Sequence, residues 1–361
     1  MSKNRTSSAL PPALRGYRER AREALGAGTF DALFGLRGDG NWDGNFANVD
    51  GFAARPLKPS IMRDVSDPQT EVAVLGGSCA LPLVVAPMGY GNRFHADGEA
   101  GMIAAAGEAG IPYCASMAAS ETIESLVSSS EGPIWFQVWM LRDRDAMARL
   151  LERAAEAGAQ AIILASIHHA LYRPRPAFEA AAAPPPGRGT GIPNLGGLGF
   201  DPVPTPAEFH GCLDMSLNWR DLEWLRSSTS LPLVLKGVQV AADARRAIDL
   251  GVGGIIVSNH GGPGLPTPRA TLDCLLEVSA AVDGSSTELL LDGGVRSGAD
   301  VLKALAAGAR SVLIGRAPFW GLAADGRAGA ADVLSILDRE LRTAMAYAGV
   351  TSVSEVPAAL I

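Results

Sequence analysis

The sequence lacks three features that would place it in other classes of protein. It has only four cysteines, at positions 79, 114, 212 and 274, with no CxxC or CxH spacing, which excludes a zinc or disulfide framework. It has no excess of positive charge: the net charge is −7 and the pI is near 5.3, which argues against a nucleic-acid or anionic-membrane surface. The first residues form no apolar signal core and no apolar run reaches transmembrane length, so we expect a cytoplasmic protein without a membrane partner.

What the sequence does contain is a regular series of short apolar segments. Its 361 residues, 47% of them hydrophobic, can hold one (β/α)8 barrel of roughly 250 residues plus extra segments. Strands are expected at 83–88, 111–116, 134–139, 161–166, 233–237, 254–258, 289–292 and 312–315. Ala-, Leu-, Glu- and Arg-rich helical segments, such as 145–157, 241–250 and 298–307, separate most of them. This alternation predicts an α/β fold with a parallel sheet closed into a (β/α)8 TIM barrel.

The glycines between the helical segments and the strands support the alternation of helices and strands. Several helical segments end at a glycine before the next strand, at Gly110, Gly158, Gly251 and Gly308, which is typical C-cap chemistry. Residues 1–70 contain one expected helix, 12–25, and then a Gly/Asn/Asp-rich stretch at 35–51. Because this part has too little apolar periodicity for a core of its own, we expect an N-terminal extension that packs on a barrel formed by residues 71–361.

One connection is much longer than the others. Residues 172–230, between the fourth and fifth expected strands, include a Pro/Gly/Ala-rich part at 180–204. A long loop on the functional face of a barrel is typically a lid or a mobile substrate loop, so we expect a lid here. The alternative is a disordered insertion without a role.

Four consecutive expected strands end in functional side chains. Lys236 ends the fifth strand, His260 follows the sixth, Asp292 and Arg296 follow the seventh, and Arg316 follows the eighth. A cation at the end of a buried strand is costly unless it is paired or faces a ligand. One ligand over the carboxyl-terminal face of a barrel accounts for all four ends together.

The loops after the last two strands have the composition of a phosphate site. Asp292-Gly293-Gly294-Val295-Arg296 and Gly315-Arg316 combine glycine backbone NH groups with guanidinium groups. Lys236 would place positive charge against an anionic ring, and Gln137 and Ser116 would hydrogen-bond a polar ring edge. A phosphate, a planar polar ring and a histidine indicate flavin mononucleotide (FMN) with His260 as the base. A phosphosugar barrel would share the phosphate loops without needing the Lys236 and His260 pair.

Ordered motifs along nearly the whole chain, from Phe30 to Val353, match a known family. They are Ile61-Met62-Arg63-Asp64-Val65-Ser66, Ala86-Pro87-Met88, His95-Ala96-Asp97-Gly98-Glu99, Phe136-Gln137, Ser216-Leu217-Asn218-Trp219, Leu235-Lys236-Gly237-Val238, Ser258-Asn259-His260-Gly261, Asp292-Gly293-Gly294-Val295-Arg296 and Ile314-Gly315-Arg316. On these residues the chain resembles the FMN-dependent 2-hydroxy-acid oxidases and dehydrogenases, which include glycolate oxidase, lactate oxidase and mandelate dehydrogenase.

The resemblance implies roles for the matching residues. Lys236 would lie beside the N1/O2 edge of the flavin, and His260 would take a proton from the substrate as a hydride or its equivalent passes to flavin N5. The expected FMN-binding residues are Ala86, Pro87, Met88, Ser116, Gln137, Lys236, Ser258, His260, Gly261, Asp292, Gly293, Gly294, Arg296, Gly315 and Arg316. Members of the family are often homotetramers, so the resemblance also implies a tetramer.

The substrate half of the family pattern is missing. The family's arginine three residues after the histidine is Pro263, and its second substrate arginine falls on Pro174, flanked by Arg173 and Arg175. A strand tyrosine becomes Trp139. The other departures are Ala32 for an N-terminal tyrosine, Ala118 for a large pocket residue, and Ile167 for the aspartate that orients the histidine. Without its bidentate arginine the site would hold a small 2-hydroxy acid loosely.

These departures predict a small-molecule substrate larger and less anionic than lactate. The first hypothesis is an FMN-dependent oxidation of a CH–OH or CH–NH centre, in a biosynthetic, natural-product (secondary metabolite) intermediate. The second keeps FMN but changes the chemistry to a monooxygenase, an isomerase or an oxidative decarboxylase. The third is a degenerate barrel that binds FMN for structure, against which the retained Lys236 and His260 argue.

Two histidines that depart from the family pattern follow the fourth expected strand. His168 and His169 would lie at the mouth of the barrel, where one of them would replace the base or contact the substrate; the alternative is that they only fill loop space. A metal site with His260 lacks a nearby carboxylate or thiolate ligand, so no metal is predicted. Arg269 is a further candidate for the missing substrate arginine.

Overall fold

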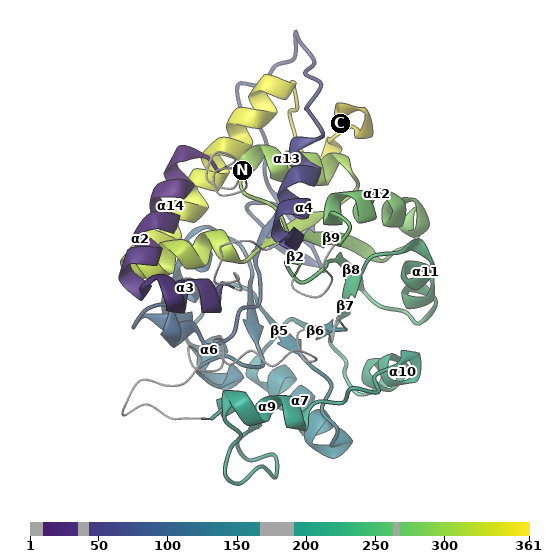
Figure 1. Cartoon of the computed structure of the whole chain (residues 1–361). Coiled ribbons are helices and arrows are strands. Elements are labelled where there is room, and N and C mark those ends of the chain that lie inside the picture. Colours follow the sequence, from purple (N-terminus) through teal and green to yellow (C-terminus); the bar gives the residue numbers. More distant parts are fainter. Residues whose placement is uncertain (1–9, 35–42, 167–190, 263–267) are drawn as a thin grey trace.

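The computed structural model describes residues 10–34, 43–166, 191–262 and 268–361. Eight parallel strands form a closed barrel in the order β10-β3-β4-β5-β6-β7-β8-β9 (Figure 1). They are β3 (Leu83–Val85), β4 (Tyr113–Ser116), β5 (Ile134–Val138), β6 (Ala161–Ala165), β7 (Leu233–Val238), β8 (Gly254–Val257), β9 (Glu288–Asp292) and β10 (Ser311–Ile314). Each lies at an expected strand, so the TIM-barrel prediction is confirmed.

Helices surround the barrel strands (Figure 1). After successive strands come α5 (Gly98–Glu108), α6 (Ile123–Ser128), α7 (Arg144–Ala157), α10 (Trp219–Ser227), α11 (Ala241–Asp249), α12 (Thr271–Val282), α13 (Gly298–Ala306) and α14 (Arg316–Ala348). The helices therefore cover the outer face of the barrel, and β3, β4, β5, β6, β8 and β10 are buried along their whole length. No helix in the described ranges has the length and apolarity needed to cross a bilayer.

The glycine caps expected from the sequence are present. Gly110, Gly158, Gly251 and Gly308 all have positive φ angles, and Gly158 closes α7 in the left-handed conformation. A side chain at Gly158 would make that turn unfavourable because its Cβ would crowd the backbone. The glycines thus end each helix where the chain must turn back into the barrel.

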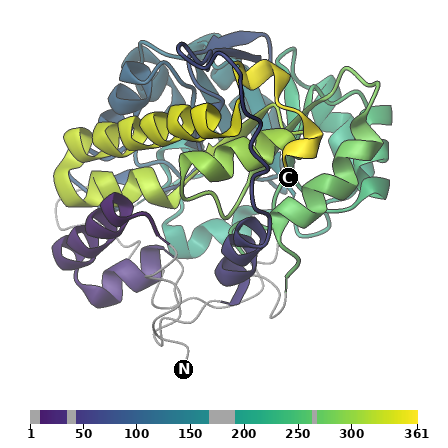
Figure 2. The same ribbon diagram turned by 90° about the horizontal axis from the view of Figure 1, so that it is seen from above.

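The N-terminal segment contains more helix than the sequence indicated. The expected helix is α2 (Pro12–Leu25), which packs along α14, where the Tyr17 hydroxyl donates to Asp332 at 2.7 Å. It is followed by α3 (Ala27–Leu33) and α4 (Asp43–Ala53), the second of which begins in the Gly/Asn/Asp-rich stretch. Figure 2 shows these N-terminal helices along one side of the barrel. Only one helix was expected in this segment, and α4 forms because packing, and not helix propensity, stabilises it.

The packing of α4 depends on two asparagines. Asn48 in α4 and Asn259 after β8 exchange amide hydrogen bonds of 2.9 and 2.8 Å, and Asn48 also accepts from the backbone N of Thr271 at 3.1 Å. A Cβ on Gly294 would lie 2.9 Å from Asn48 atoms, so only glycine permits this approach. The buried amide pair therefore joins the N-terminal segment directly to the loops that follow β8 and β9.

Other elements not expected from the sequence are short. The antiparallel hairpin of β1 (Val72–Val74) and β2 (Gly77–Cys79) packs against the start of β8 and β9, where the backbone N of Leu75 donates to Glu288 at 2.9 Å. The long connection after β6 contains η3 (Pro193–Leu195) and α9 (Pro206–Cys212) before α10. The remaining short helices are η1 (Gly91–Arg93), η4 (Val353–Glu355) and η5 (Ala358–Leu360).

The last two barrel helices approach each other closely at one glycine. A Cβ on Gly298, at the start of α13, would lie 1.9 Å from the backbone N of Leu341 in α14. We expect Gly298→Ala to lower the free energy of unfolding by about 3 kcal/mol, because the clash involves backbone that cannot rotate away. Urea unfolding of the holoprotein measures this difference.

The matched control is Gly107→Ala in α5, where an added Cβ meets nothing within 4 Å. This substitution should raise stability by about 0.5–1 kcal/mol, because alanine loses less backbone entropy in a helix. Equal effects of the two substitutions would show that α13 and α14 do not pack at Gly298.

Candidate active site

A cavity of about 270 Å³ opens at the carboxyl-terminal ends of the barrel strands. Residues that follow seven of the strands line it: Ala86, Pro87, Met88, Gly89, Tyr90, Ser116, Ala118, Gln137, Trp139, Lys236, His260, Gly261, Asp292, Gly293, Gly294, Val295, Arg296, Gly315 and Arg316. Leu33 and Phe34 from the N-terminal segment and Phe209 and His210 from α9 complete the wall. All but one of the expected FMN-binding residues lie here, and the exception, Ser258, is buried directly behind Lys236.

Two guanidinium groups define one end of the cavity. Arg296 is 6% exposed and its guanidinium stacks on the Trp320 ring at 5.5 Å. Arg316, the first residue of α14, donates through Nη2 to the Gly261 carbonyl at 3.2 Å, and a Cβ on Gly261 would lie 2.9 Å from that nitrogen. The start of α14 and these two side chains therefore face the same space, an arrangement that suits a phosphate.

The two arginines at this end of the cavity would be stabilised by a bound anion. Burial first, and then repulsion by Arg316, lowers the pKa of Arg296 to about 9. Asp300 offsets this only in part, through attraction to Arg296. A phosphate group would relieve the burial and the repulsion together, because it accepts hydrogen bonds from both guanidinium groups.

The centre of the cavity contains a buried ion pair. Lys236 Nζ lies 2.6 Å from Asp292 Oδ2 and donates to Ser258 Oγ at 3.0 Å, with 5% of the lysine side chain and 11% of the aspartate side chain exposed. Ser258 Oγ also accepts from the backbone N of His260 at 3.0 Å. One serine hydroxyl thus connects the cavity lysine with the backbone of the histidine.

Two buried polar atoms lack protein partners and test whether a flavin fits. Ser116 Oγ donates to Gln137 Oε1 at 3.1 Å, which orients the amide and leaves Gln137 Nε2 without a hydrogen-bond partner. Asp292 Oδ1 is likewise buried and without a partner. Buried polar groups are rarely unsatisfied unless a ligand completes them, so a polar ring edge beside Gln137 and a polar group at Asp292 fit this site.

The backbone at His260 is strained. Its φ is 56°, and Gly261 and Gly262 follow with φ of 77° and 90°, so three consecutive residues have left-handed conformations. Tyr90, which also lines the cavity, has φ of 61°. A non-glycine residue in this region costs about 1–2 kcal/mol, and such strain is concentrated at functional sites. The Asn48–Asn259 pair and the Ser258 hydroxyl hold the loop in this conformation.

The other end of the cavity is largely aromatic. The Trp139 and His260 rings lie 5.6 Å apart between centroids, at an interplanar angle of 56°. Tyr90, Ala118 and His210 also line the cavity. Tyr90 is a neutral phenol at physiological pH, as any tyrosine with an ordinary pKa is, and burial raises its pKa further. Among the described residues, this part is therefore walled by imidazole, phenol and indole groups.

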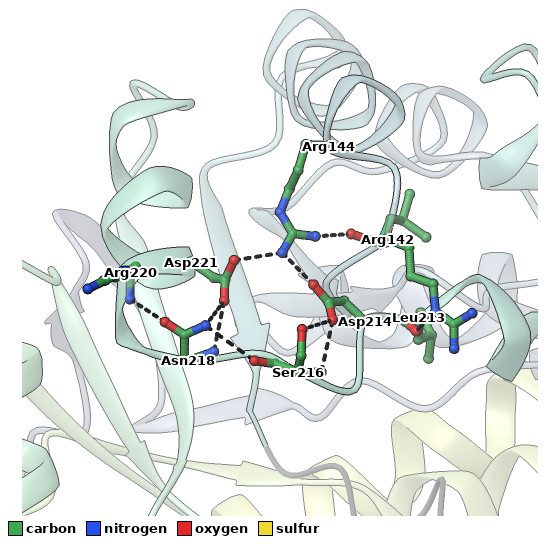
Figure 3. A network of polar contacts seen from close by, with 9 residues as sticks. Arg142, Arg144, Leu213, Asp214, Ser216, Asn218, Arg220 and Asp221 are labelled. Atoms are coloured by element: carbon green, nitrogen blue, oxygen red, sulfur yellow. Dashed lines mark hydrogen bonds and ion pairs between the residues drawn. The ribbon is translucent and has the colours of Figure 1, made fainter.

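A polar clamp holds α9 at this end (Figure 3). The guanidinium of Arg144 reaches Asp214 and Asp221, the second at 2.6 Å, and also the Leu141 carbonyl. Asp214 in turn accepts from the Ser216 hydroxyl at 2.6 Å. Because Asp214 follows α9 and Arg144 begins α7, the clamp fixes α9 against the segment after β5.

The structure does not place two of the predicted site residues, Ala32 and Arg269, in the cavity. Ala32 is buried but does not line the cavity, because the end of α3 brings Leu33 and Phe34 to it instead. Arg269 does not replace the missing arginine: its Nη1 pairs with Glu277 at 2.8 Å in α12. Residues 167–169, 173–175 and 263 lie outside the described residues, so the predictions on His168, His169, Arg173, Arg175 and Pro263 stay predictions.

Tyr90 and His210 are cavity residues that the sequence reasoning missed. Tyr90 had an available signal, since it follows Ala86-Pro87-Met88-Gly89 at the end of a barrel strand. His210 lies 45 residues beyond the end of β6, and only the capping box of Thr205 and Glu208 marks its helix in the sequence. Its place in the cavity depends on tertiary packing.

Comparisons with known proteins identify the family of the chain. A model of the FMN-dependent dehydrogenase family matches residues 21–361. The chain is 37% identical to the L-lactate oxidase of Nostoc sp. (97% of this chain, 98% of the relative) and 38% identical to the 4-hydroxymandelate oxidase of Amycolatopsis orientalis (92% and 93%). A crystal structure of mandelate oxidase superposes with a TM-score of 0.84 at 35% identity, over 96% of each chain.

Fold and site together define a flavin-dependent oxidoreductase with a TIM barrel. The chain belongs to the FMN-dependent dehydrogenase family, among the 2-hydroxy-acid oxidases and dehydrogenases. Its cofactor is FMN.

The phosphate end gives a direct test of cofactor binding. We expect Arg296→Met to weaken FMN binding by about 10- to 100-fold, because a charge-assisted hydrogen bond contributes about 1.5–3 kcal/mol. Quenching of FMN fluorescence on titration of the apoprotein measures the dissociation constant. Arg339→Met, on the exposed side of α14 where Arg339 contacts Ser335, is the control and should leave it unchanged. Equal affinities would place the phosphate elsewhere.

The clamp gives a pH-dependent test. Burial opposes ionisation of Asp214, but hydrogen bonds from Ser216 and Arg144 outweigh it and lower its pKa to about 2 from 3.8. The carboxylate therefore stabilises the fold fully above about pH 4, and this contribution is lost as the pH falls toward 2. Arg144→Met should lower the free energy of unfolding by about 1–3 kcal/mol at pH 7.

Urea unfolding at pH 7 and at pH 3 measures the effect of Arg144→Met, which should shrink at the lower pH, because without Arg144 the pKa of Asp214 rises back toward its ordinary value and the folded variant takes up a proton that the wild type largely does not. Arg339→Met again serves as the control, with no effect at either pH. A loss of stability in Arg144→Met that is the same at both pH values would contradict a role for the Asp214 carboxylate in the clamp.

Proposed function

We propose that this enzyme oxidises a CH–OH or CH–NH centre of a substrate that is bulkier and less anionic than glycolate or lactate. The observation that carries the proposal is the composition of the cavity beside His260. Its described walls are Trp139, Tyr90, Ala118, Phe209 and His210, none of which is a guanidinium. The three cations that line the described cavity, Lys236, Arg296 and Arg316, all belong to the cofactor half.

The residues present divide the work of such a reaction. Bound FMN would supply the two-electron acceptor for the C–H bond that is oxidised. His260 accepts the proton from the substrate hydroxyl or amine, and its position is fixed by the Ser258 hydroxyl and the Asn48–Asn259 pair. Lys236, held between Asp292 and Ser258, places positive charge at the centre of the cavity. The Trp139 ring packs against the His260 ring, with 5.6 Å between their centroids.

A related structure supports an uncharged substrate group. One similar crystal structure is that of a mandelate oxidase variant in which an arginine is replaced by leucine, with 2-hydroxy-phenylacetamide (TM-score 0.80, 36% identity). In that protein the ligand has an amide where mandelate has a carboxylate. This chain has proline at both family arginine positions, Pro174 and Pro263, which favours the same change of ligand. We propose that the natural substrate is a biosynthetic intermediate, handled by a homotetramer as the family resemblance implies.

The test compares two substrates that differ only in charge. Anaerobic bleaching of the bound flavin should be at least about tenfold more efficient with 2-hydroxy-phenylacetamide than with (S)-mandelate, because a buried carboxylate without a guanidinium partner loses about 1.5–3 kcal/mol of binding. Glycolate and lactate should be poorer still. Stopped-flow visible absorbance gives the rate and the apparent dissociation constant separately.

The control for this reaction is His260→Asn. The variant should keep the visible spectrum of bound flavin, because the other cofactor contacts remain. Its flavin should no longer be reduced by 2-hydroxy-phenylacetamide, because asparagine cannot act as the base. Preference for mandelate over the amide would refute the uncharged substrate. Undiminished reduction in His260→Asn would refute oxidation with His260 as base and favour a different flavin chemistry.

A further inference from the structure

We propose that His210 is a specificity-determining residue that hydrogen-bonds a neutral polar group of the substrate, such as an amide, beyond the reacting carbon. This inference rests on the proposed function, since it names the group that recognises the uncharged end of the substrate. His210 is only partly buried and lines the same cavity as His260 and Trp139. It is supplied by α9 and not by a barrel strand.

The position of His210 is fixed by backbone pairing. Leu213, three residues after His210, forms an antiparallel bridge with Leu141, two residues after Trp139. The backbone N of Arg142 donates to the Cys212 carbonyl at 2.9 Å, and that of Asp214 donates to Met140 at 2.8 Å. The end of α9 is therefore attached to the segment that follows Trp139.

Side chains strengthen this attachment at both ends of α9. At its start, the Thr205 hydroxyl and the Glu208 carboxylate form a reciprocal capping box. Beyond its end, the Arg144 clamp joins Asp214 and Asp221 (Figure 3). Because these contacts attach both ends of α9, His210 is held in the wall of the cavity.

The chemistry of that wall favours a neutral ligand group. Imidazole can both donate and accept a hydrogen bond, as an amide requires. Tyr90, a phenol that is neutral at physiological pH, lines the same cavity. Asp292, the carboxylate that lines the cavity among the described residues, is paired with Lys236 in the cofactor half. An amide of the substrate can therefore form hydrogen bonds with His210 and Tyr90. A substrate carboxylate would instead bring a second negative charge into the cavity that contains Asp292.

The experiment is a titration of the oxidised, FMN-loaded protein with phenylacetamide, followed through the flavin visible spectrum. Phenylacetamide has no hydroxyl to oxidise, so the dissociation constant reports binding alone. We expect His210→Ala to weaken binding of phenylacetamide by about 5- to 20-fold, and His210→Gln, whose amide also donates and accepts, to recover much of the loss. Binding of phenylacetate, the charged counterpart, should change by less than about twofold in both variants.

The matched control is Cys212→Ser, on the same helix at a residue that does not line the cavity, and it should bind phenylacetamide as the wild type does. Unchanged phenylacetamide affinity in His210→Ala, an equal loss for phenylacetate, or no binding to the wild type would each overturn the proposal. Wild-type protein that binds phenylacetamide through His210 but is not reduced by 2-hydroxy-phenylacetamide would refute the proposed oxidation and retain the His210 site.

Discussion

Positive charge buried at the carboxyl-terminal mouth of the barrel is the constraint on which the rest of the site depends. Lys236, Arg296 and Arg316 end or follow strands whose interiors are apolar, and little solvent reaches the first two. Buried cations are tolerated only where anions or hydrogen-bond acceptors surround them. Asp292 satisfies Lys236 from within the chain, whereas Arg296 and Arg316 repel each other, and an anion bound by both would offset that repulsion.

The same charges organise the neighbouring backbone. Ser258, which accepts from Lys236, also accepts from the His260 backbone, so Lys236 and His260 share one hydrogen-bond network. The adjacent Asn259 is held by Asn48 of α4. The N-terminal segment therefore contributes to the site by keeping the strained His260 loop in place, and not by supplying a catalytic group.

The two halves of the cavity are built in different ways. The cofactor half consists of strand ends and their loops, whose positions follow from closure of the barrel. The substrate half also uses α9, which belongs to the long connection after β6 and is attached through the Arg144 clamp. Because these two supports are separate, residues of the α9 wall can change without displacing the strand ends that line the rest of the cavity.

Local pattern in the sequence determined the eight strands, the glycine caps, and the position of Lys236, His260 and the glycine-arginine loops at the strand ends that line the cavity, because strand periodicity and strand-end chemistry are encoded within a few residues. Tertiary structure alone decided the features that depend on contacts between distant segments. Helix α4 forms in a Gly/Asn-rich stretch because Asn48 finds Asn259 211 residues away. Arg269 forms an ion pair with Glu277. Leu33 and Phe34 line the cavity where Ala32 was expected, and His210 lines it from α9. No local pattern encodes which distant partner a side chain meets, since that partner is set by how the whole barrel packs.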